Sequence, residues 1–159
     1  MMTQLNDTLS VTREPPTPRT FSKAYWDATR EKRLLVQYDK RSGKYQFFPR
    51  ATSIYSGHRD LEWREVSGKG EIFSYTVARR ARPPFQGHEP FLIGLVTLDE
   101  GVNVMANIVH CGPEKIRIGL RVKPFWLPLA NGTHLLMFEP TDPGGLANGQ
   151  VFAVRRAAS

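Results

Sequence analysis

Apolar positions recur with a helical period in only one part of this chain. Between residues 19 and 33 they fall at positions 21, 24, 25 and 28, which lie on one face of a helix. Thr20 or Ser22 can cap the start of this helix. The stretch LLVQY at residues 34–38 follows without a break and predicts a strand.

The second half of the chain has the pattern of a β-sheet protein. Short apolar runs alternate with turn residues, and turn signals at 100–101 (EG) and 131–132 (NG) each join two runs. Pro124 and Pro128 place the fourth run at a sheet edge or a bulge. Because a closed barrel removes exposed strand edges, the pattern predicts a five-stranded barrel with strands at residues 70–81, 91–100, 102–109, 121–130 and 133–140.

Residues 39–60, between these two regions, are rich in turn formers and polar side chains. This composition predicts a small, irregular ribbon of short strands. We therefore divide the chain into a flexible arm, a helix with a ribbon, a barrel domain and a flexible tail, at residues 1–19, 20–66, 67–141 and 142–159.

The amino-acid composition indicates which cellular compartment and which kind of binding partner to expect. No apolar run reaches the length of about 18 residues that a transmembrane helix requires, and the N-terminus lacks the basic start and apolar stretch of a secretory signal. Cys111 is the only cysteine, so no intramolecular disulfide is possible and a reducing cytoplasm is expected. The formal charge of +7 and the pI of about 9.9 indicate an anionic partner.

Several short motifs follow one another in a fixed order. The ribbon contains DKRSG, FFPR and SIYS, and the pieces LEW, FSYTV, LDEGV and IRIGLRV come after them. This order resembles the DUF35 family, in which a rubredoxin-like zinc ribbon precedes an OB-fold domain. The resemblance covers about residues 20–140. It implies a mainly β fold, with an N-terminal helix and a degenerate zinc ribbon followed by a five-stranded OB-fold barrel.

The four cysteines of the family's ribbon are absent from this chain. Their positions hold Asp39, Ser42, Ser53 and Ser56, and His58 lies close by. One carboxylate and three hydroxyls are poor substitutes for the thiolates or imidazoles of a structural zinc site, so we expect no zinc. Apolar packing or a partner subunit must then hold the ribbon, and the apolar side chains available for this are Tyr38, Tyr45, Phe47, Phe48, Ile54 and Tyr55.

The resemblance also implies an accessory role in acyl-CoA metabolism. Such proteins are similar to partners of thiolase-like enzymes, aldolases and hydratases, and their OB-fold domain helps to line a channel for CoA. We therefore expect a non-catalytic subunit of an acyltransferase or thiolase-like complex, which binds the larger enzyme and a CoA thioester. The residues expected to contact that partner are Tyr25, Trp26, Phe47, Phe48 and Pro49. The four aromatic side chains among them should then be partly exposed in the isolated chain.

Basic side chains supply candidate contacts to the phosphates of CoA. Arg79, Arg80 and Arg82 are followed by Phe85 at the end of the first barrel strand, and residues 30–50 carry a net charge of +5. These charges can equally form a solvated face or meet an acidic partner. Arg50 is a further candidate with an alternative role, because the arginine of an aromatic-Pro-Arg turn can bond turn carbonyls across the ribbon.

Two other functions fit parts of the sequence. A single-stranded nucleic-acid-binding OB-fold would combine the basic charge with stacking on Phe73, Tyr75 and Phe125, although the barrel core also needs such side chains. An independent enzyme would use Cys111 or an acidic residue. His110 precedes Cys111, but neighbours on a strand point to opposite faces, so we expect an inert thiol and no catalytic residue.

Overall fold

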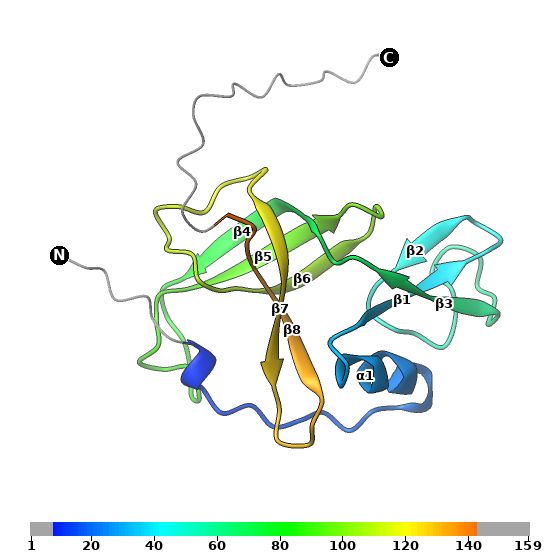
Figure 1. The fold of residues 1–159 in the computed structure, drawn as a ribbon, viewed down its shortest axis with the longest axis horizontal. Helices are drawn as coiled ribbons and strands as arrows, with labels where there is room; N and C mark the ends of the chain where they lie inside the picture. Colours follow the sequence, from blue (N-terminus) through cyan, green and yellow to red (C-terminus); the bar gives the residue numbers. More distant parts are fainter. Residues whose placement is uncertain (1–7, 143–159) are drawn as a thin grey trace, which may run out of the picture.

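The computed structural model describes residues 8–142, which form a small ribbon beside a β-barrel (Figure 1). The helical elements are the 3₁₀ turns Thr8–Ser10 and Thr20–Ser22 and the helix α1 (Lys23–Thr29). The strands are β1 (Leu34–Asp39), β2 (Lys44–Gln46), β3 (Leu61–Val66), β4 (Gly70–Ala78), β5 (Phe91–Leu98), β6 (Asn103–Ile108), β7 (Arg121–Pro128) and β8 (His134–Pro140). The predicted flexible tail lies outside the described residues, apart from its first residue.

The ribbon is an antiparallel sheet in the order β2-β1-β3. β1 pairs with β3 along its whole length, but with β2 over only three residue pairs. Leu34 and Val36 of β1 are 2% and 1% exposed and belong to the same core cluster as the barrel residues. Between Gln46 and Leu61 the chain forms no strand, so other interactions must hold this segment.

The remaining five strands form the predicted closed barrel, in the OB-fold order β4-β5-β6-β8-β7. β4 pairs with β5 along its length but meets β7 only at Gly70 and Glu71. Pro124 and Pro128 lie in the part of β7 whose single neighbouring strand is β8. This position confirms the expected sheet edge, where a residue without an N–H group is tolerated.

Alternate residues of β5 point into the barrel. Leu92, Val96 and Leu98 are at most 2% exposed. At Gly94, the remaining inward position, a Cβ atom would come within 2.7 Å of the Ile108 side chain, so the close packing there requires glycine. The period of two that predicts this strand is therefore the alternation between the inside and the outside of the barrel.

The helix is shorter than the sequence pattern predicts. Residues Thr20–Ser22 form a 3₁₀ turn, and Ser22 does not cap α1, because its hydroxyl accepts from Arg19 N and donates to Arg19 O. Lys32, with a φ of 56°, turns the chain from the end of α1 into β1. No helix within residues 8–142 is long and apolar enough to cross a membrane.

Part of the predicted flexible arm packs against the barrel. Thr8 and Val11 are 5% and 6% exposed. The guanidinium of Arg13 donates to Thr8 O at 2.8 Å and to Val11 O at 3.3 Å, and it lies over the ring of Phe85. Residues 8–13 therefore belong to the packed structure.

Candidate functional site

The five residues expected to contact a partner surround one apolar pocket of about 270 Å³, which we call the helix–ribbon pocket. It lies where α1 and the ribbon turn at residues 47–49 meet strands β6 and β8 of the barrel. The structure thus brings together segments that are far apart in the sequence. The predicted residues share the pocket with Ser22, Val104, Met105, Leu135 and Leu136.

Two large apolar side chains of this pocket remain on the surface. Phe48 is 52% exposed and Met105 is 56% exposed. Tyr25 is only 6% exposed, so the expectation that its side chain is partly exposed is wrong. Its ring makes edge contacts with Trp26 and Phe47, and burial raises the pKa of its hydroxyl. Tyr25 therefore supports the pocket, while Phe48 and Met105 are available to a partner.

Two buried glutamines, which no sequence pattern singles out, hold the ribbon turn. Gln37 and Gln46 are 4% and 2% exposed, and Gln46 Nε2 donates to Gln37 Oε1 at 2.8 Å. The Gln37 amide also bonds the backbone N–H and C=O of Arg50, and the Gln46 amide bonds Thr52 O and Ile54 N. The two amides therefore attach residues 50–54 to β1 and β2 and fix the turn that carries Phe48.

The opposite wall of the pocket is fixed by contacts between α1 and the β7–β8 hairpin. The hydroxyl of Thr29 accepts a hydrogen bond from His134 N, and Thr29 O lies 2.8 Å from His134 Nδ1. Arg30 donates to Asn131 O at 2.7 Å. Because these pairs are about a hundred residues apart in the chain, sequence periodicity contains no signal for them.

The four residues at the family's cysteine positions lie together in the ribbon. The Asp39 carboxylate is 1% exposed and accepts a hydrogen bond from Ser53 Oγ at 2.6 Å. The N–H of Arg41 also donates to it at 2.9 Å, and the hydroxyls of Ser56 and Ser42 lie close enough to help lower its pKa. The bond from Ser53 contributes most to holding the pKa of Asp39 well below its ordinary value, although burial acts in the opposite direction.

This set of donors does not fit zinc, because a structural zinc site uses thiolates or imidazoles. Among residues 8–142, no three His, Cys, Asp or Glu side chains form a group that could hold a metal. The apolar cluster expected to replace the metal is only partly formed. Tyr38 and Tyr45 pack at 4.9 Å, but Ile54 and Tyr55 are 56% and 47% exposed.

The predicted phosphate contacts lie in the β4–β5 loop, on the opposite side of the molecule from the ribbon (Figure 1). Arg79, Arg80 and Arg82 are exposed, and none of them pairs with a carboxylate in the described part of the chain. Arg50 lies on the ribbon, so the structure does not bring it to these arginines. It bonds the Gln37 amide through its backbone, and its side chain is exposed.

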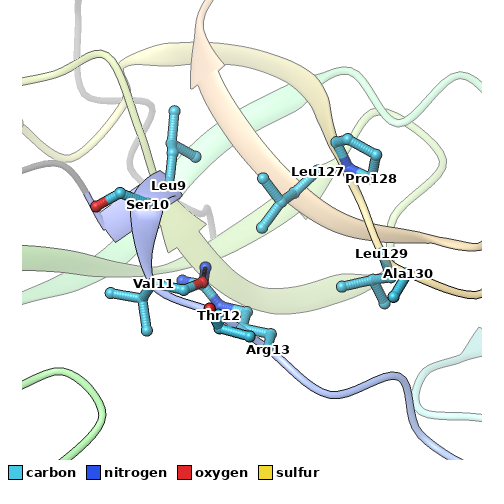
Figure 2. A pocket seen from close by; sticks show the side chains of 9 residues that line it. All are labelled: Leu9, Ser10, Val11, Thr12, Arg13, Leu127, Pro128, Leu129 and Ala130. Carbon is cyan, nitrogen blue, oxygen red and sulfur yellow. Dashed lines mark hydrogen bonds between the residues drawn. The ribbon is translucent and has the colours of Figure 1, made fainter.

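A second pocket, of about 260 Å³, adjoins the β4–β5 loop. Figure 2 shows Leu9 and Val11 of the N-terminal segment on one side of it, with Leu127 and Leu129 on the other. Arg13 also lines this pocket, and its guanidinium lies 5.1 Å from the centre of the Phe85 ring. Arg13 therefore links this pocket to Phe85, the aromatic member of the predicted ligand contacts.

Cys111 has the environment of a packed thiol. It is 7% exposed, and burial raises the pKa of its thiol. His110 is directed elsewhere, because its Nδ1 lies 2.6 Å from a Glu139 oxygen and its ring meets Phe125 edge-on. These contacts agree with an inert thiol.

The aromatic side chains considered for nucleic-acid stacking differ in their exposure. Phe73 and Tyr75 of β4 are 58% and 39% exposed. They therefore do not fill the barrel core, although the core was expected to need such side chains. Phe125 is half-buried against His110. An exposed aromatic pair on β4 is therefore a second surface feature of the barrel.

Comparison with known proteins identifies the family. A model of the C-terminal OB-fold domain of ChsH2 matches residues 63–127. A DUF35 domain-containing scaffold protein from Pyrococcus furiosus is 32% identical over 99 residues, which are 62% of this chain and 73% of that protein. The chain belongs to the DUF35 family.

Two further relatives of this DUF35 protein carry enzyme names. A solved structure described as an Ltp2-ChsH2(DUF35) aldolase is 28% identical with a TM-score of 0.69, covering 79% of this chain and 98% of that one. A probable enoyl-CoA hydratase alpha subunit from Thermomonospora curvata is 32% identical over 122 residues, which are 76% of this chain. The present chain spans only 38% of that subunit's length.

Replacing Gln46 by alanine should loosen the ribbon turn of this DUF35 protein. The change leaves Thr52 O and Ile54 N without their partner, so we expect the free energy of unfolding to fall by about 1–3 kcal/mol. Urea unfolding measures this loss, and hydrogen exchange should show faster exchange at Ile54 N–H. Gln86→Ala, in the exposed β4–β5 loop, is the matched control. Wild-type protection of Ile54 in the Gln46 variant would contradict the role of the network.

Asp39 should make stability depend on pH in acid. Its pKa is lower in the folded protein than in the unfolded chain, where it is about 3.9. Its stabilisation is therefore complete above about pH 5 and is lost as the pH falls through the ordinary carboxyl range toward the lowered folded-state pKa. Thermal melts at a series of acidic pH values should show a shallower loss for Asp39→Asn than for wild type. Asp60→Asn, an exposed ribbon carboxylate, should keep the wild-type slope.

Proposed function

We propose that this protein is a non-catalytic accessory subunit that docks on a larger acyl-CoA-processing enzyme through the helix–ribbon pocket. The observation that carries the proposal is the pocket itself, in which half-exposed Phe48 and Met105 lie beside a rigidly held aromatic wall. Exposed apolar side chains next to a preformed pocket are typical of protein interfaces. The partner can be a thiolase-like enzyme, an aldolase or a hydratase.

The family relatives support a role within an enzyme complex. The Pyrococcus furiosus relative is described as a scaffold protein, and others carry the names of an aldolase and a hydratase alpha subunit. Within the described residues of the present chain, the buried thiol of Cys111 has no imidazole base directed at it. A scaffold that completes another subunit's site agrees with both observations. A cytoplasmic location belongs to the same proposal, because the chain's single cysteine suits a reducing compartment.

A CoA thioester is the proposed ligand of the β4–β5 loop. Arg79, Arg80 and Arg82 are exposed and have no carboxylate partner among residues 8–142, so their guanidinium groups can meet phosphates. The adjoining pocket offers apolar walls, and Phe85 is held between Arg13 and Phe91. Phosphates and an apolar part of one ligand can therefore be bound next to each other. Arg50 lies too far around the molecule to share this site.

Truncation of Phe48 tests the docking surface. The tagged chain is purified from its own cells, and the co-eluting enzyme is identified by mass spectrometry and purified. We expect Phe48→Ala to weaken the complex about tenfold or more without changing the melting temperature of the free chain, because the side chain is already half-exposed. Phe73→Ala, equally exposed on β4, is the matched control and should bind normally. The reverse result would place the interface on the barrel and overturn the assignment of the pocket.

Removal of the three loop arginines tests the ligand. In the assembled complex, the combined Arg79→Ala, Arg80→Ala and Arg82→Ala variant should bind a CoA thioester about tenfold or more weakly by calorimetry. The control removes the same charge from the exposed ribbon residues Lys40, Lys44 and Arg59. If both variants lost the same affinity for the CoA thioester, binding would depend on the overall charge of the chain and not on the loop arginines. Tight single-stranded DNA binding that falls steeply with salt would instead favour the nucleic-acid alternative.

A further inference from the structure

We infer that the buried carboxylate of Asp39 takes the place that the metal has in the family's ribbon, so that a hydrogen-bonded knot of Asp39, Ser42, Ser53 and Ser56 holds the ribbon without zinc. The knot stabilises the ribbon whether or not the protein has the accessory role.

The first support is that the two turns meeting at the knot have the same hydrogen-bond scheme. In the first turn, the Asp39 side chain accepts from Arg41 N at 2.9 Å, and Asp39 O accepts from Gly43 N at 2.8 Å. The second turn repeats this scheme from Ser53. Its Oγ accepts from Tyr55 N and Ser56 N, and its C=O accepts from Gly57 N. Each turn ends four residues on at a glycine with a positive φ. The paired turns of a ribbon site are therefore retained.

The second support is that the side chains converge from both turns on one group. Ser42 belongs to the first turn, and Ser53 and Ser56 belong to the second. The Ser53 hydroxyl donates to the Asp39 carboxylate at 2.6 Å, and the Ser42 and Ser56 hydroxyls lie close enough to help lower its pKa. Asp39 and Ser53 are 1% and 4% exposed, so the bond between the turns is shielded from water. The carboxylate thus links the two turns as a central metal ion would link four ligands.

The third support is the balance of donors and acceptors. An ionised carboxylate accepts about four hydrogen bonds. The N–H of Arg41 and the hydroxyl of Ser53 supply two of these donors, and the hydroxyls of Ser42 and Ser56 are the nearby groups that interact with the same carboxylate. A cation at this point would have to displace those donors and be bound by neutral hydroxyls, which are weak ligands for zinc. Protein donors therefore hold the carboxylate in place without a metal.

The first experiment measures metal content and melting temperature with the full chain. Wild-type protein expressed with added zinc should contain no stoichiometric zinc, and a chelator should leave its melting temperature unchanged. At neutral pH, Asp39→Asn should lower the melting temperature by roughly 5 °C or more, because a neutral amide replaces the charged acceptor of the bonds from Ser53 and Arg41. Asp60→Asn, an exposed carboxylate of the same ribbon, is the control and should have little effect. Stoichiometric zinc in the wild type, or an unaffected Asp39→Asn variant, would overturn the inference.

The second experiment restores the metal site. Asp39→Cys, Ser42→Cys, Ser53→Cys and Ser56→Cys are combined, and the protein is prepared under reducing conditions with zinc. Because the four side chains converge, the variant should bind one zinc ion per chain, and its melting temperature should fall when a chelator is added. A folded variant that binds no zinc, or one that stays unfolded with excess zinc, would show that the positions do not converge and would refute the knot as a metal substitute.

Discussion

Buried hydrogen bonds from side chains to backbone hold the ribbon, and the shape of the candidate docking surface depends on them. β2 is only three residues long and the chain from Gln46 to Leu61 has no strand, so strand pairing alone cannot position this segment. The amides of Gln37 and Gln46 and the carboxylate of Asp39 do so instead. Because an unpaired buried polar group is costly, these networks favour one conformation of the turn over the alternatives.

The structure separates two kinds of surface. The helix–ribbon pocket is apolar and lies against one side of the barrel, whereas the arginines of the β4–β5 loop lie on the opposite side of the molecule. Apolar side chains buried at a contact provide affinity, while charges provide attraction and orientation. The proposed accessory role assigns the enzyme partner to the first surface and the anionic ligand to the second.

Local patterns predicted most of the fold correctly. Alternation in β5 and the turn signals between strands lead directly to the barrel, and the two prolines of β7 lie at the expected edge. The helix was predicted too long because its first residues, Thr20–Ser22, form a 3₁₀ turn and because Lys32 adopts a left-handed conformation before the predicted end. Tyr25 was expected on the surface, yet the ribbon turn covers it. The first error concerns local backbone conformation, whereas the second concerns a contact with another segment.

The sequence by itself determined the barrel, the ribbon and the absence of cysteines from the ribbon, because strand periodicity, turn residues and residue types can be read from neighbouring positions. Only the tertiary structure decided that Asp39 bonds Ser53 of the next turn and that Gln37 and Gln46 hold the ribbon turn. It also decided that α1 meets the β7–β8 hairpin, about a hundred residues away. Hydroxyl and amide side chains follow no periodic pattern along the sequence. Their hydrogen-bond partners are therefore determined only when folding brings distant segments together.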